Sequence, residues 1–298
     1  MNLEKFLKMT LAFQLLLLIV LTYPTKSSKS DISSLTELKK QNISKIILNE
    51  NDKTLELTKQ SDIWFLKDKF NFPANQDKVA RILDSIFTNQ KLQKVGQSNN
   101  ALVKYKLADN NYQEKITVYD NVKEESFLFG DTPEFKKIYI RNQKSNDSYV
   151  INLSKFDLGV DINSWYQKNF LGFKKELIKK ISFDSFSISK EKDKEKNIDK
   201  FIVNNLEEKQ DDEKVDFLIN KLISLSFKDI LSSDKINLPS PDFKIEVLKE
   251  DGSNVTLSFK KINDKFILKV SNMPFDFEVS KNIFNDFKEA KKSDLVVK

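Results

Sequence analysis

The sequence predicts an α+β protein: two domains of antiparallel sheet with helices, preceded by one apolar N-terminal helix. Three observations support this prediction. Met9 to Tyr23 carries no charge, strand-length segments of alternating apolar residues recur along the rest of the chain, and the order of these segments starts again near Leu177. In each domain strands come first, one helix follows, and an antiparallel meander leads to a closing helix. Strands and helices segregated in this way are typical of the α+β class.

The uncharged stretch near the N-terminus decides the compartment in which the rest of the chain works. Its fifteen residues, Met9 to Tyr23, form a helix of only ~22 Å, against a hydrocarbon core of ~30 Å. If Phe6 and Leu7 join it and the Lys8 ammonium reaches the headgroups, the segment spans roughly 27 Å, which suits a thin bilayer. Two interpretations of residues 1–24 therefore stay open, a cleaved signal peptide and an uncleaved anchor.

The residues that flank this stretch favour the uncleaved anchor. Lys5 and Lys8 form the positively charged flank that signal peptides and anchors share. Pro24 to Ser28 contains no A-x-A-like cleavage site, and a chain without cysteine cannot carry a lipoprotein anchor. Residues 25–41 are rich in Ser, Lys and Thr and have little periodicity, so we expect a tether between the membrane and the folded body.

The composition excludes several kinds of chemistry. The 298 residues include no Cys and no His, which removes disulfides, thiol catalysis, His-dependent triads and the common zinc sites. The net charge of +6 is mild for this length, and no helix or strand gathers Arg and aromatic residues. We therefore expect no nucleic-acid partner. Beyond the anchor, about 275 residues remain, which fits two domains of ordinary size.

The first domain is predicted over residues 42–172. Apolar alternation favours strands in its first part, and a turn of Asn and Asp residues separates two of them. Asn75 is placed to cap a helix, because apolar residues recur at helical spacing from Val79 to Phe87. Expected strands lie near Ile43–Leu48, Thr54–Thr58, Ile63–Leu66, Lys91–Val95, Lys115–Tyr119, Ser126–Phe129, Ile138–Arg141 and Ser148–Asn152, with a helical turn within Asn152–Asn169.

The second domain is predicted over residues 173–298, because the same order of elements starts again. Ile178–Phe183 aligns with Ile43–Leu48 at an offset of 135, and Glu213–Leu222 aligns with Asp77–Ile86 at an offset of 136. Two later pairs of strands keep the order at offsets of 129 and 128. A near-constant offset with a repeated pattern favours an internal duplication. The alternative is two unrelated α+β halves in a chain rich in Lys and Ile.

No group of residues carries a clear catalytic signal. Asp211–Glu213 lies at the start of a predicted helix, where acidic side chains favour the macrodipole. Asp109 and Asp120 are expected to form turns. Gly130 lacks the second Gly and the Lys-Ser/Thr of a phosphate-binding loop, and we expect it to relieve φ strain at a strand end. We therefore name no catalytic, cofactor-binding or metal-binding residue and expect no cofactor.

Trp64 and Trp165 could form a platform for a ligand, but their context favours the core. Each is flanked by apolar residues at the spacing expected for the strand or helical turn that contains it. Large aromatic side chains in such positions dominate core energetics. We therefore expect both to be buried anchors.

An ordered set of residues lies between Ile43 and Lys180: Trp64, Phe72-Pro73-Ala74-Asn75, Lys78-Val79, Tyr105-Lys106-Leu107, Phe129-Gly130, Tyr139-Ile140-Arg141, Tyr149, Trp165 and Lys168. This set resembles the bacterial DUF4340 family. There a Trp strand leads to an aromatic-Pro-Ala-Asp helix start, followed by Tyr-Gly-Leu, a strand-end Gly, a Tyr-Val-Arg strand and a Trp-Arg-Asp-Lys segment. Two positions depart from it: Asn75 stands for the usual Asp, and Lys106 for the Gly of Tyr-Gly-Leu.

The resemblance implies a membrane-anchored, extracytoplasmic protein of uncharacterised function. Such proteins are often encoded beside ABC-transporter components similar to the gliding-motility type. No catalytic residues are known for the family, so none can be assigned here.

We expect a non-enzymatic, single-pass protein of the bacterial inner membrane, with most of the chain in the periplasm. It would serve as an accessory subunit of an ABC-transporter-like envelope complex, with the membrane and a protein of that complex as partners. The alternative is a secreted or anchored binder of an envelope polymer or small ligand, which an apolar groove of ligand size between the domains would favour. A third hypothesis, a hydrolase that uses Asp or Glu alone, would need two carboxylates that converge in a cleft.

Overall fold

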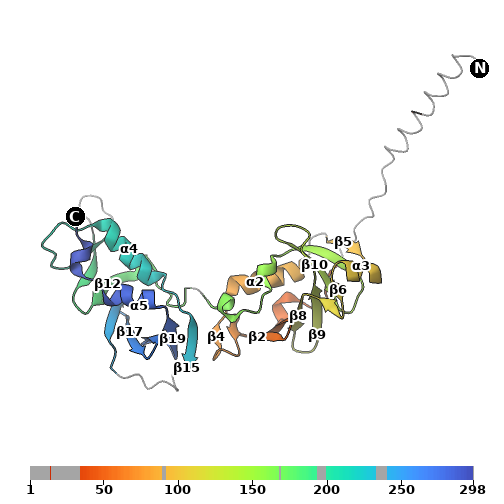
Figure 1. The fold of residues 1–298 in the computed structure, drawn as a ribbon, viewed down its shortest axis with the longest axis horizontal. Helices are drawn as coiled ribbons and strands as arrows, with labels where there is room; N and C mark the ends of the chain where they lie inside the picture. Colours follow the sequence, from red (N-terminus) through yellow and green to blue (C-terminus); the bar gives the residue numbers. More distant parts are fainter. Residues whose placement is uncertain are drawn as a thin grey trace, which may run out of the picture. The chain divides into compact units, whose positions relative to one another are not determined.

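A computed structural model of the chain describes Gln14 and residues 34–88, 92–167, 169–192, 199–232 and 240–297. In this part the protein has an α+β fold with two large antiparallel sheets and four α-helices (Figure 1). The predicted anchor over residues 1–24 lies outside the described residues, except for Gln14, which is helical. No helix in the described part is long and apolar enough to cross a membrane.

The first sheet has the strand order β4-β3-β2-β1-β8-β9-β10-β11-β5. The register of β1 and β8 places Lys45 opposite Tyr119 and Glu50 opposite Glu114. A separate two-stranded sheet pairs β6 (Leu107–Ala108) with β7 (Asn111–Tyr112). The nine strands are β1 (Lys45–Glu50), β2 (Lys53–Gln60), β3 (Ile63–Leu66), β4 (Phe72–Pro73), β5 (Gln93–Gly96), β8 (Glu114–Tyr119), β9 (Glu124–Phe129), β10 (Lys137–Asn142) and β11 (Ser148–Asn152).

The second sheet repeats this order as β14-β13-β12-β16-β17-β18-β19-β15. Four consecutive strands come first in the first sheet and three in the second. In both sheets a helix and one edge strand then follow, and a four-stranded meander completes the sheet. An internal duplication would produce this repeat, and the duplication itself stays a prediction. The eight strands are β12 (Ile178–Phe183), β13 (Ser187–Lys192), β14 (Asp199–Val203), β15 (Asp229–Ser232), β16 (Phe243–Lys249), β17 (Asn254–Ile262), β18 (Lys265–Val270) and β19 (Phe275–Val279).

The strands form where the sequence alternates, because one face of each sheet is covered. In β16, Phe243, Ile245 and Val247 are buried while Lys244 and Glu246 are exposed. The pattern is the one expected for an antiparallel strand with one face against the core.

Two of the four helices begin where the sequence predicts. Asn75 Oδ1 accepts a hydrogen bond from Lys78 N at 3.1 Å, and Asp211 Oδ1 accepts one from Lys214 N at 3.2 Å. The predicted cap of the first helix and the acidic start of the second are therefore confirmed, because each satisfies a backbone donor that has no partner inside its helix. The helices are α2 (Gln76–Ile86), α3 (Asn99–Lys104), α4 (Asp212–Ile223) and α5 (Lys281–Lys288).

By its internal contacts the chain divides into two compact units, which we describe separately. Unit 1 comprises the described parts of Met1–Thr54 and Ala80–Val160, and unit 2 those of Leu55–Val79 and Asp161–Lys298. The predicted domains, 42–172 and 173–298, instead follow the two sheets, and stay a prediction.

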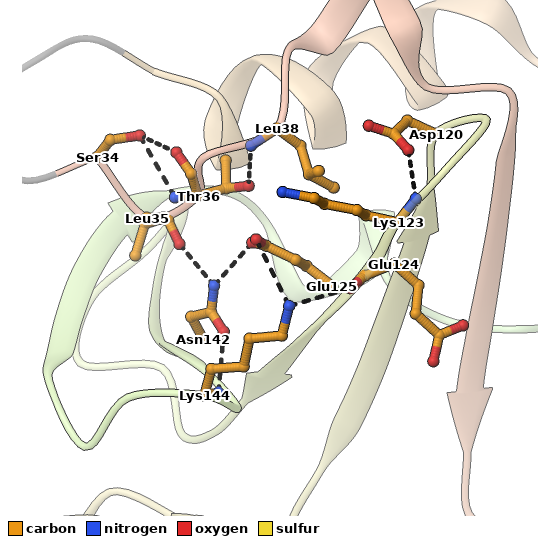
Figure 2. Close-up of polar contacts among 10 residues, drawn as sticks. All are labelled: Ser34, Leu35, Thr36, Leu38, Asp120, Lys123, Glu124, Glu125, Asn142 and Lys144. Carbon is orange, nitrogen blue, oxygen red and sulfur yellow. Dashed lines mark hydrogen bonds and ion pairs between the residues drawn. The ribbon is translucent and has the colours of Figure 1, made fainter.

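The chain enters unit 1 through residues 34–38, which pack against the end of β10 (Figure 2). Leu35 is 4 % exposed, and its carbonyl oxygen accepts a hydrogen bond from Asn142 Nδ2 at 2.8 Å. Asn142 Nδ2 also donates to the buried Glu125 carboxylate at 2.9 Å, and Lys144 Nζ lies 3.8 Å from that carboxylate. Folded structure is therefore present by Ser34, within the residues predicted as a tether.

Candidate functional site: a groove in unit 2

One group of residues from the family resemblance fixes the start of α2. Trp64 and Trp165 are 6 % and 0 % exposed, which confirms their predicted core positions. Asn75 N donates to Trp165 O at 2.7 Å, and Lys78 Nζ lies 4.1 Å from the centroid of the Trp165 ring. Because both tryptophan side chains are buried, neither offers a face to a ligand.

A second group lies in unit 1, where α3 and β6 pack against β9 and β10. The rings of Tyr105 and Tyr139 stack with centroids 4.3 Å apart. A Cβ on Gly130 would lie 1.9 Å from Tyr105 O, and the φ of Gly130 is not positive. The prediction that Gly130 relieves φ strain is therefore wrong. Glycine is needed there because the Tyr105 backbone approaches too closely for any side chain.

Arg141 completes this second group as a buried guanidinium. It is 2 % exposed and donates to Leu107 O at 2.8 Å, to Ser145 O at 3.1 Å and to Asp109 Oδ1 at 2.6 Å. Asp109, which the sequence suggested only as a turn former, also supplies the counter-charge that a buried guanidinium requires. These contacts hold α3 and β6 in place.

The carboxylates in the described parts of the chain do not converge on a metal site. No group there of three or more His, Cys, Asp or Glu residues could hold a metal ion. Asp120 forms the predicted turn, since its Oδ1 accepts hydrogen bonds from Lys123 N at 2.6 Å and Val122 N at 2.7 Å. Those two hydrogen bonds lower the pKa of Asp120.

Two buried carboxyl groups have oxygen atoms without a hydrogen-bond partner in the described structure. Glu114 is 2 % exposed and Asp276 is fully buried. Burial raises the pKa of both groups. Lys155 Nζ, 3.5 Å from Glu114 Oε1, opposes the shift of Glu114. Both groups therefore bind a proton more readily than an exposed carboxyl does.

Unit 2 contains an open groove of about 560 Å³. This volume lies within the range of roughly 300–1,000 Å³ that is common for ligand pockets. One wall is the 3-10 turn η3 (Ile162–Trp165) with the loop after it, and it contributes Asn163, Tyr166, Gln167 and Asn169. The other wall is the C-terminal end of α4 with the loop after it, and it contributes Ile223, Ser224, Ser226 and Phe227.

Phe227 forms the apolar part of the groove, at the edge of an aromatic cluster. Its ring centroid lies 4.8 Å from that of Phe170, 4.9 Å from Tyr166, 5.0 Å from Phe277 and 5.5 Å from Phe72. Tyr166 is only 5 % exposed, whereas Phe227 is partly exposed. Because the neighbouring rings pack around Phe227, this apolar surface is formed before any ligand arrives.

Tyr166 connects the groove to an ion pair. Its hydroxyl donates to Asp229 Oδ1 at 2.9 Å, and Lys69 Nζ lies 2.6 Å from the same oxygen. Burial, and then the hydrogen bond to Asp229, raises the pKa of Tyr166. Burial also acts to raise the pKa of Asp229, but the hydrogen bonds from Lys69, Ile230 N and Tyr166 outweigh it, so that the pKa is lowered. Tyr166 therefore keeps its hydroxyl proton. That hydroxyl contacts Asp229, whose charge is balanced by Lys69.

The groove has no distinctive signal in the sequence. Its two walls lie about 60 residues apart in the chain, and the lining residues that the structure describes are all uncharged. The one available signal is the run of uncharged polar residues around Trp165 and Tyr166, which also occurs in ordinary loops. The prediction that the chain has no catalytic, cofactor-binding or metal-binding residue stays a prediction.

Comparison with known proteins gives one match. A family model described as a domain of unknown function (DUF4340) matches residues 64–259, about two thirds of the chain. No curated protein and no solved structure matches. The matched region contains both groups of pattern residues and both walls of the groove.

Proposed function

The chain belongs to the family of DUF4340-domain proteins, and on that premise we propose that it is a non-enzymatic accessory subunit of an ABC-transporter-like envelope complex. In this proposal residues 1–24 anchor it in the bacterial inner membrane as a single pass, and the two sheets lie on the periplasmic side. The gene neighbourhood that the family resemblance implies supports a protein partner. Among the described pattern residues of the family, Trp64, Trp165 and Arg141 are buried in the core.

The observation that carries this proposal is a pair of phenylalanines exposed at one end of the sheet in unit 1. Phe135 is 85 % exposed and Phe156 is 88 % exposed. Phe135 lies two residues before β10 and Phe156 lies four residues after β11, and the register pairs Lys137 with Asn152 at this end of the two strands. Aromatic side chains are enriched at protein interfaces, where they supply much of the binding energy.

The register also indicates which end of unit 1 bears this pair. Residues 34–38 enter unit 1 at Asn142, the last residue of β10, whereas Phe135 precedes the first residue of that strand. If the segment before Ser34 is the membrane anchor, Phe135 and Phe156 lie at the end of the sheet away from the point of entry. That position favours a protein partner over the lipid surface as the surface that covers them.

The test is affinity purification of the full chain, tagged at its C-terminus, from detergent-solubilised membranes, with mass spectrometry of the partners and of the protein's own N-terminus. We expect an uncleaved N-terminus together with the subunits of an ABC transporter. The double variant Phe135→Ser/Phe156→Ser should recover at least tenfold less of these subunits, because truncating central aromatic anchors costs about 2 kcal/mol or more.

A matched control is available at the other end of the sheet. Val122 is 87 % exposed in the turn between β8 and β9, so Val122→Ser changes an equally exposed apolar residue and should leave the partners in place. Full recovery of the partners with the double variant would exclude the phenylalanine pair as the contact. A mature N-terminus near Ser27 without any membrane partner would contradict the accessory role itself.

The groove of unit 2 favours the second candidate function, a binder of an envelope polymer or small ligand. The lining residues that the structure describes combine apolar and polar side chains, which is the character of a binding pocket. The lining contains no carboxylate among the described residues, so the hypothesis of an Asp/Glu hydrolase gains no support there. A secreted, partner-free product in the purification above would make this candidate the preferred one.

A further inference from the structure

We propose that Phe135 and Phe156 form one rigid two-point contact, joined by the side chain of Gln113, and that its occupant is a protein surface with two uncharged apolar pockets. The existence of a protein partner rests on the proposed function, and the inference adds how the contact is built and which chemistry it selects. The residues that carry it belong to unit 1 and lie within residues 34–88 and 92–167 of the described chain.

Phe156 lies in a turn that is fixed on both sides of the ring. The turn is the 3-10 turn η2 (Lys155–Asp157). On one side Lys155 Nζ lies 3.5 Å from the buried Glu114 Oε1. On the other side Arg81 Nη2 donates to Asp157 Oδ1 at 2.8 Å, and Arg81 Nε lies 3.3 Å from both carboxylate oxygens. A planar guanidinium in this arrangement fixes the direction of the carboxylate as well as its charge.

The other apolar residues of this segment are buried, whereas Phe156 is not. Leu153, Leu158 and Val160 are 3 %, 1 % and 7 % exposed, against 88 % for Phe156. A turn that could rearrange would gain free energy by burying the Phe156 ring as well. The contacts on both sides of the ring hold it outward, so a partner can cover it without a rearrangement of the turn.

Phe135 lies in a second tight turn, which is closed by both backbone and side chains. Lys137 N donates to Glu134 O at 3.1 Å, and Lys137 Nζ lies 2.9 Å from Glu134 Oε2. Lys136 has a φ of +56°, a conformation that residues with a side chain rarely adopt. Backbone strain of this kind persists only where the surrounding contacts over-determine it, and it is common at binding sites.

One side chain joins the two turns. Gln113 Nε2 donates to Asp131 Oδ1, in the segment that leads to Phe135, and Gln113 Oε1 accepts a hydrogen bond from Lys155 Nζ, next to Phe156. The amide thus satisfies a carboxylate on one side and an ammonium on the other. Hydrogen bonds to charged groups are the stronger ones, so the two turns are held at one spacing.

The family pattern supplies the base of this arrangement. Asp131 N donates to Tyr105 O at 3.1 Å, and Tyr139 N donates to Asp131 O at 3.1 Å. Lys106 Nζ lies 2.9 Å from Asp131 Oδ1. Tyr105 and Tyr139 therefore position the segment that carries Phe135, although neither is itself the proposed contact.

The charged side chains of the two turns are already engaged within the chain. The pairs are Lys155 with Glu114, Asp157 with Arg81, and Lys137 with Glu134. Lys136 Nζ lies 5.3 Å from the centroid of the Phe135 ring, in reach of its π face. An ionised group of the partner would have to break one of these pairs or be covered without a counter-charge, which is unfavourable. The pockets that fit the two rings are therefore uncharged.

The fixed spacing favours a protein over a lipid surface. A fluid lipid surface accepts aromatic side chains at any spacing, so it gains nothing from a rigid pair. Two preformed pockets accept one spacing only, and a contact that is already rigid lowers the entropy cost of binding to them.

The first test measures the spacing without a partner. Because the chain has no cysteine, Phe135→Cys/Phe156→Cys places two spin labels at these sites of the full chain in detergent. Pulsed electron paramagnetic resonance then gives the distribution of distances between the labels. We expect a narrow distribution, and a broader one when Gln113→Ala removes the link between the turns.

A matched control and a swap separate this link from a general loss of packing. Gln97 Oε1 accepts from Lys94 Nζ at 2.8 Å, so Gln97→Ala removes a similar Lys–Gln bond elsewhere in unit 1 and should leave the distribution narrow. In Gln113→Glu/Asp131→Asn the carboxylate and the amide exchange places, and the chain of hydrogen bonds can form again. The swap should restore the narrow distribution, whereas Gln113→Glu alone brings two carboxylates together and should not.

The second test measures the chemistry of the partner. The probe is the transporter complex identified in the purification, isolated from cells that lack this chain, and biolayer interferometry measures its affinity for the full chain. Gln113→Ala should weaken the affinity about three- to tenfold, because the turns must then be ordered on binding. The swap should restore it. The affinity should change less than about twofold between roughly 0.05 and 0.5 M salt, since no ion pair forms across the contact.

Three results would overturn the inference. The first is an equally broad distribution of distances in Gln113→Ala and in the chain with Gln113. The second is an affinity that falls steeply with salt, which would mean charged pockets. The third is binding to phosphatidylethanolamine/phosphatidylglycerol vesicles that Phe135→Ser/Phe156→Ser abolishes, which would make lipid the occupant. A purification without transporter subunits contradicts the proposed function instead, and the distance measurement still decides whether the two turns form one unit.

Discussion

Replacing Gly130 by alanine tests whether α3 and β6 are held by the close approach of two backbones. A Cβ at this position would lie 1.9 Å from Tyr105 O and 2.8 Å from Lys106 O, and both neighbours are main-chain atoms. Real Cβ contacts are essentially never below 3.0 Å, so the Tyr105 carbonyl must move by at least about 1 Å. That carbonyl accepts the hydrogen bond of Asp131 N at 3.1 Å, and the movement would stretch or break this bond.

The expected cost follows from these two effects. Forcing an extra methyl group into a packed site typically costs about 1–3 kcal/mol, and a lost backbone hydrogen bond adds about 1 kcal/mol. We therefore expect Gly130→Ala to lower the free energy of unfolding of unit 1 by about 2–4 kcal/mol. The two residue types have similar φ preferences here, since Gly130 does not adopt a positive φ, so backbone strain contributes little.

The assay is hydrogen exchange of the full chain, read on the peptides that cover α3 and β6, together with urea unfolding followed by circular dichroism. Gly159→Ala in the same unit is the matched control, because a Cβ there meets no atom within 4 Å. It should be neutral or stabilise by up to about 1 kcal/mol through the unfolded state. Equal protection and equal unfolding midpoints for the two alanine variants would refute the argument from close approach.

Three further predictions concern stability. Lys106 has a φ of +54° where the family pattern has Gly. Lys106→Gly should therefore raise the melting temperature by the equivalent of about 0.5–1 kcal/mol. The loss of the exposed ion pair between Lys106 and Asp131 reduces this gain slightly. Burial raises the pKa of Asp276, so its folded state keeps a proton that the unfolded state releases. The free energy of unfolding therefore falls as pH rises from about 4 through the raised pKa, and urea titrations of Asp276→Asn should lack this fall. Asn75→Ala removes the cap on Lys78 N and should cost about 1 kcal/mol in thermal unfolding, whereas Asn75→Asp should keep it.

Each of these predictions has a result that contradicts it. A lower melting temperature for Lys106→Gly would mean that the ion pair outweighs the backbone strain. If the free energy of unfolding varied with pH in the same way for the wild type and Asp276→Asn, the pKa of Asp276 would be the same in the folded and unfolded states. Equal melting temperatures of Asn75→Ala and Asn75→Asp would show that the cap contributes nothing.

Regular elements with a strong local signal could be predicted from the sequence. Strand β16 alternates apolar and polar residues over its length, and α2 combines a capping Asn75 with apolar residues at helical spacing. Both signals depend only on neighbours in the chain and on one buried face. They can therefore be recognised in the sequence without knowledge of the tertiary structure. The burial of Trp64 and Trp165 followed from the same local periodicity.

Short elements and the groove could not be predicted in this way. Helix α3 has six residues and β6 has two, which is too short for periodicity to separate them from a loop. The sequence around Gly130 does not show whether glycine is needed for a positive φ or for close packing. The atom that excludes a side chain there belongs to Tyr105, which is distant in the chain. The groove depends on Tyr166 meeting Phe227, and nothing local relates these two residues.

The structural roles of the pattern residues also bear on how function varies within the family. Gly130 and Arg141 are constrained by backbone atoms that α3 and β6 bring close to them, so a chain that keeps this packing has to keep those residues. Phe135, by contrast, is almost fully exposed, and the side-chain amide of Asn169 makes no hydrogen bond among the described residues. A change at either position costs little stability, so these surfaces can diverge while the pattern persists. Under the proposed function, the exposed aromatics and the groove lining are where partner and ligand preference would be encoded.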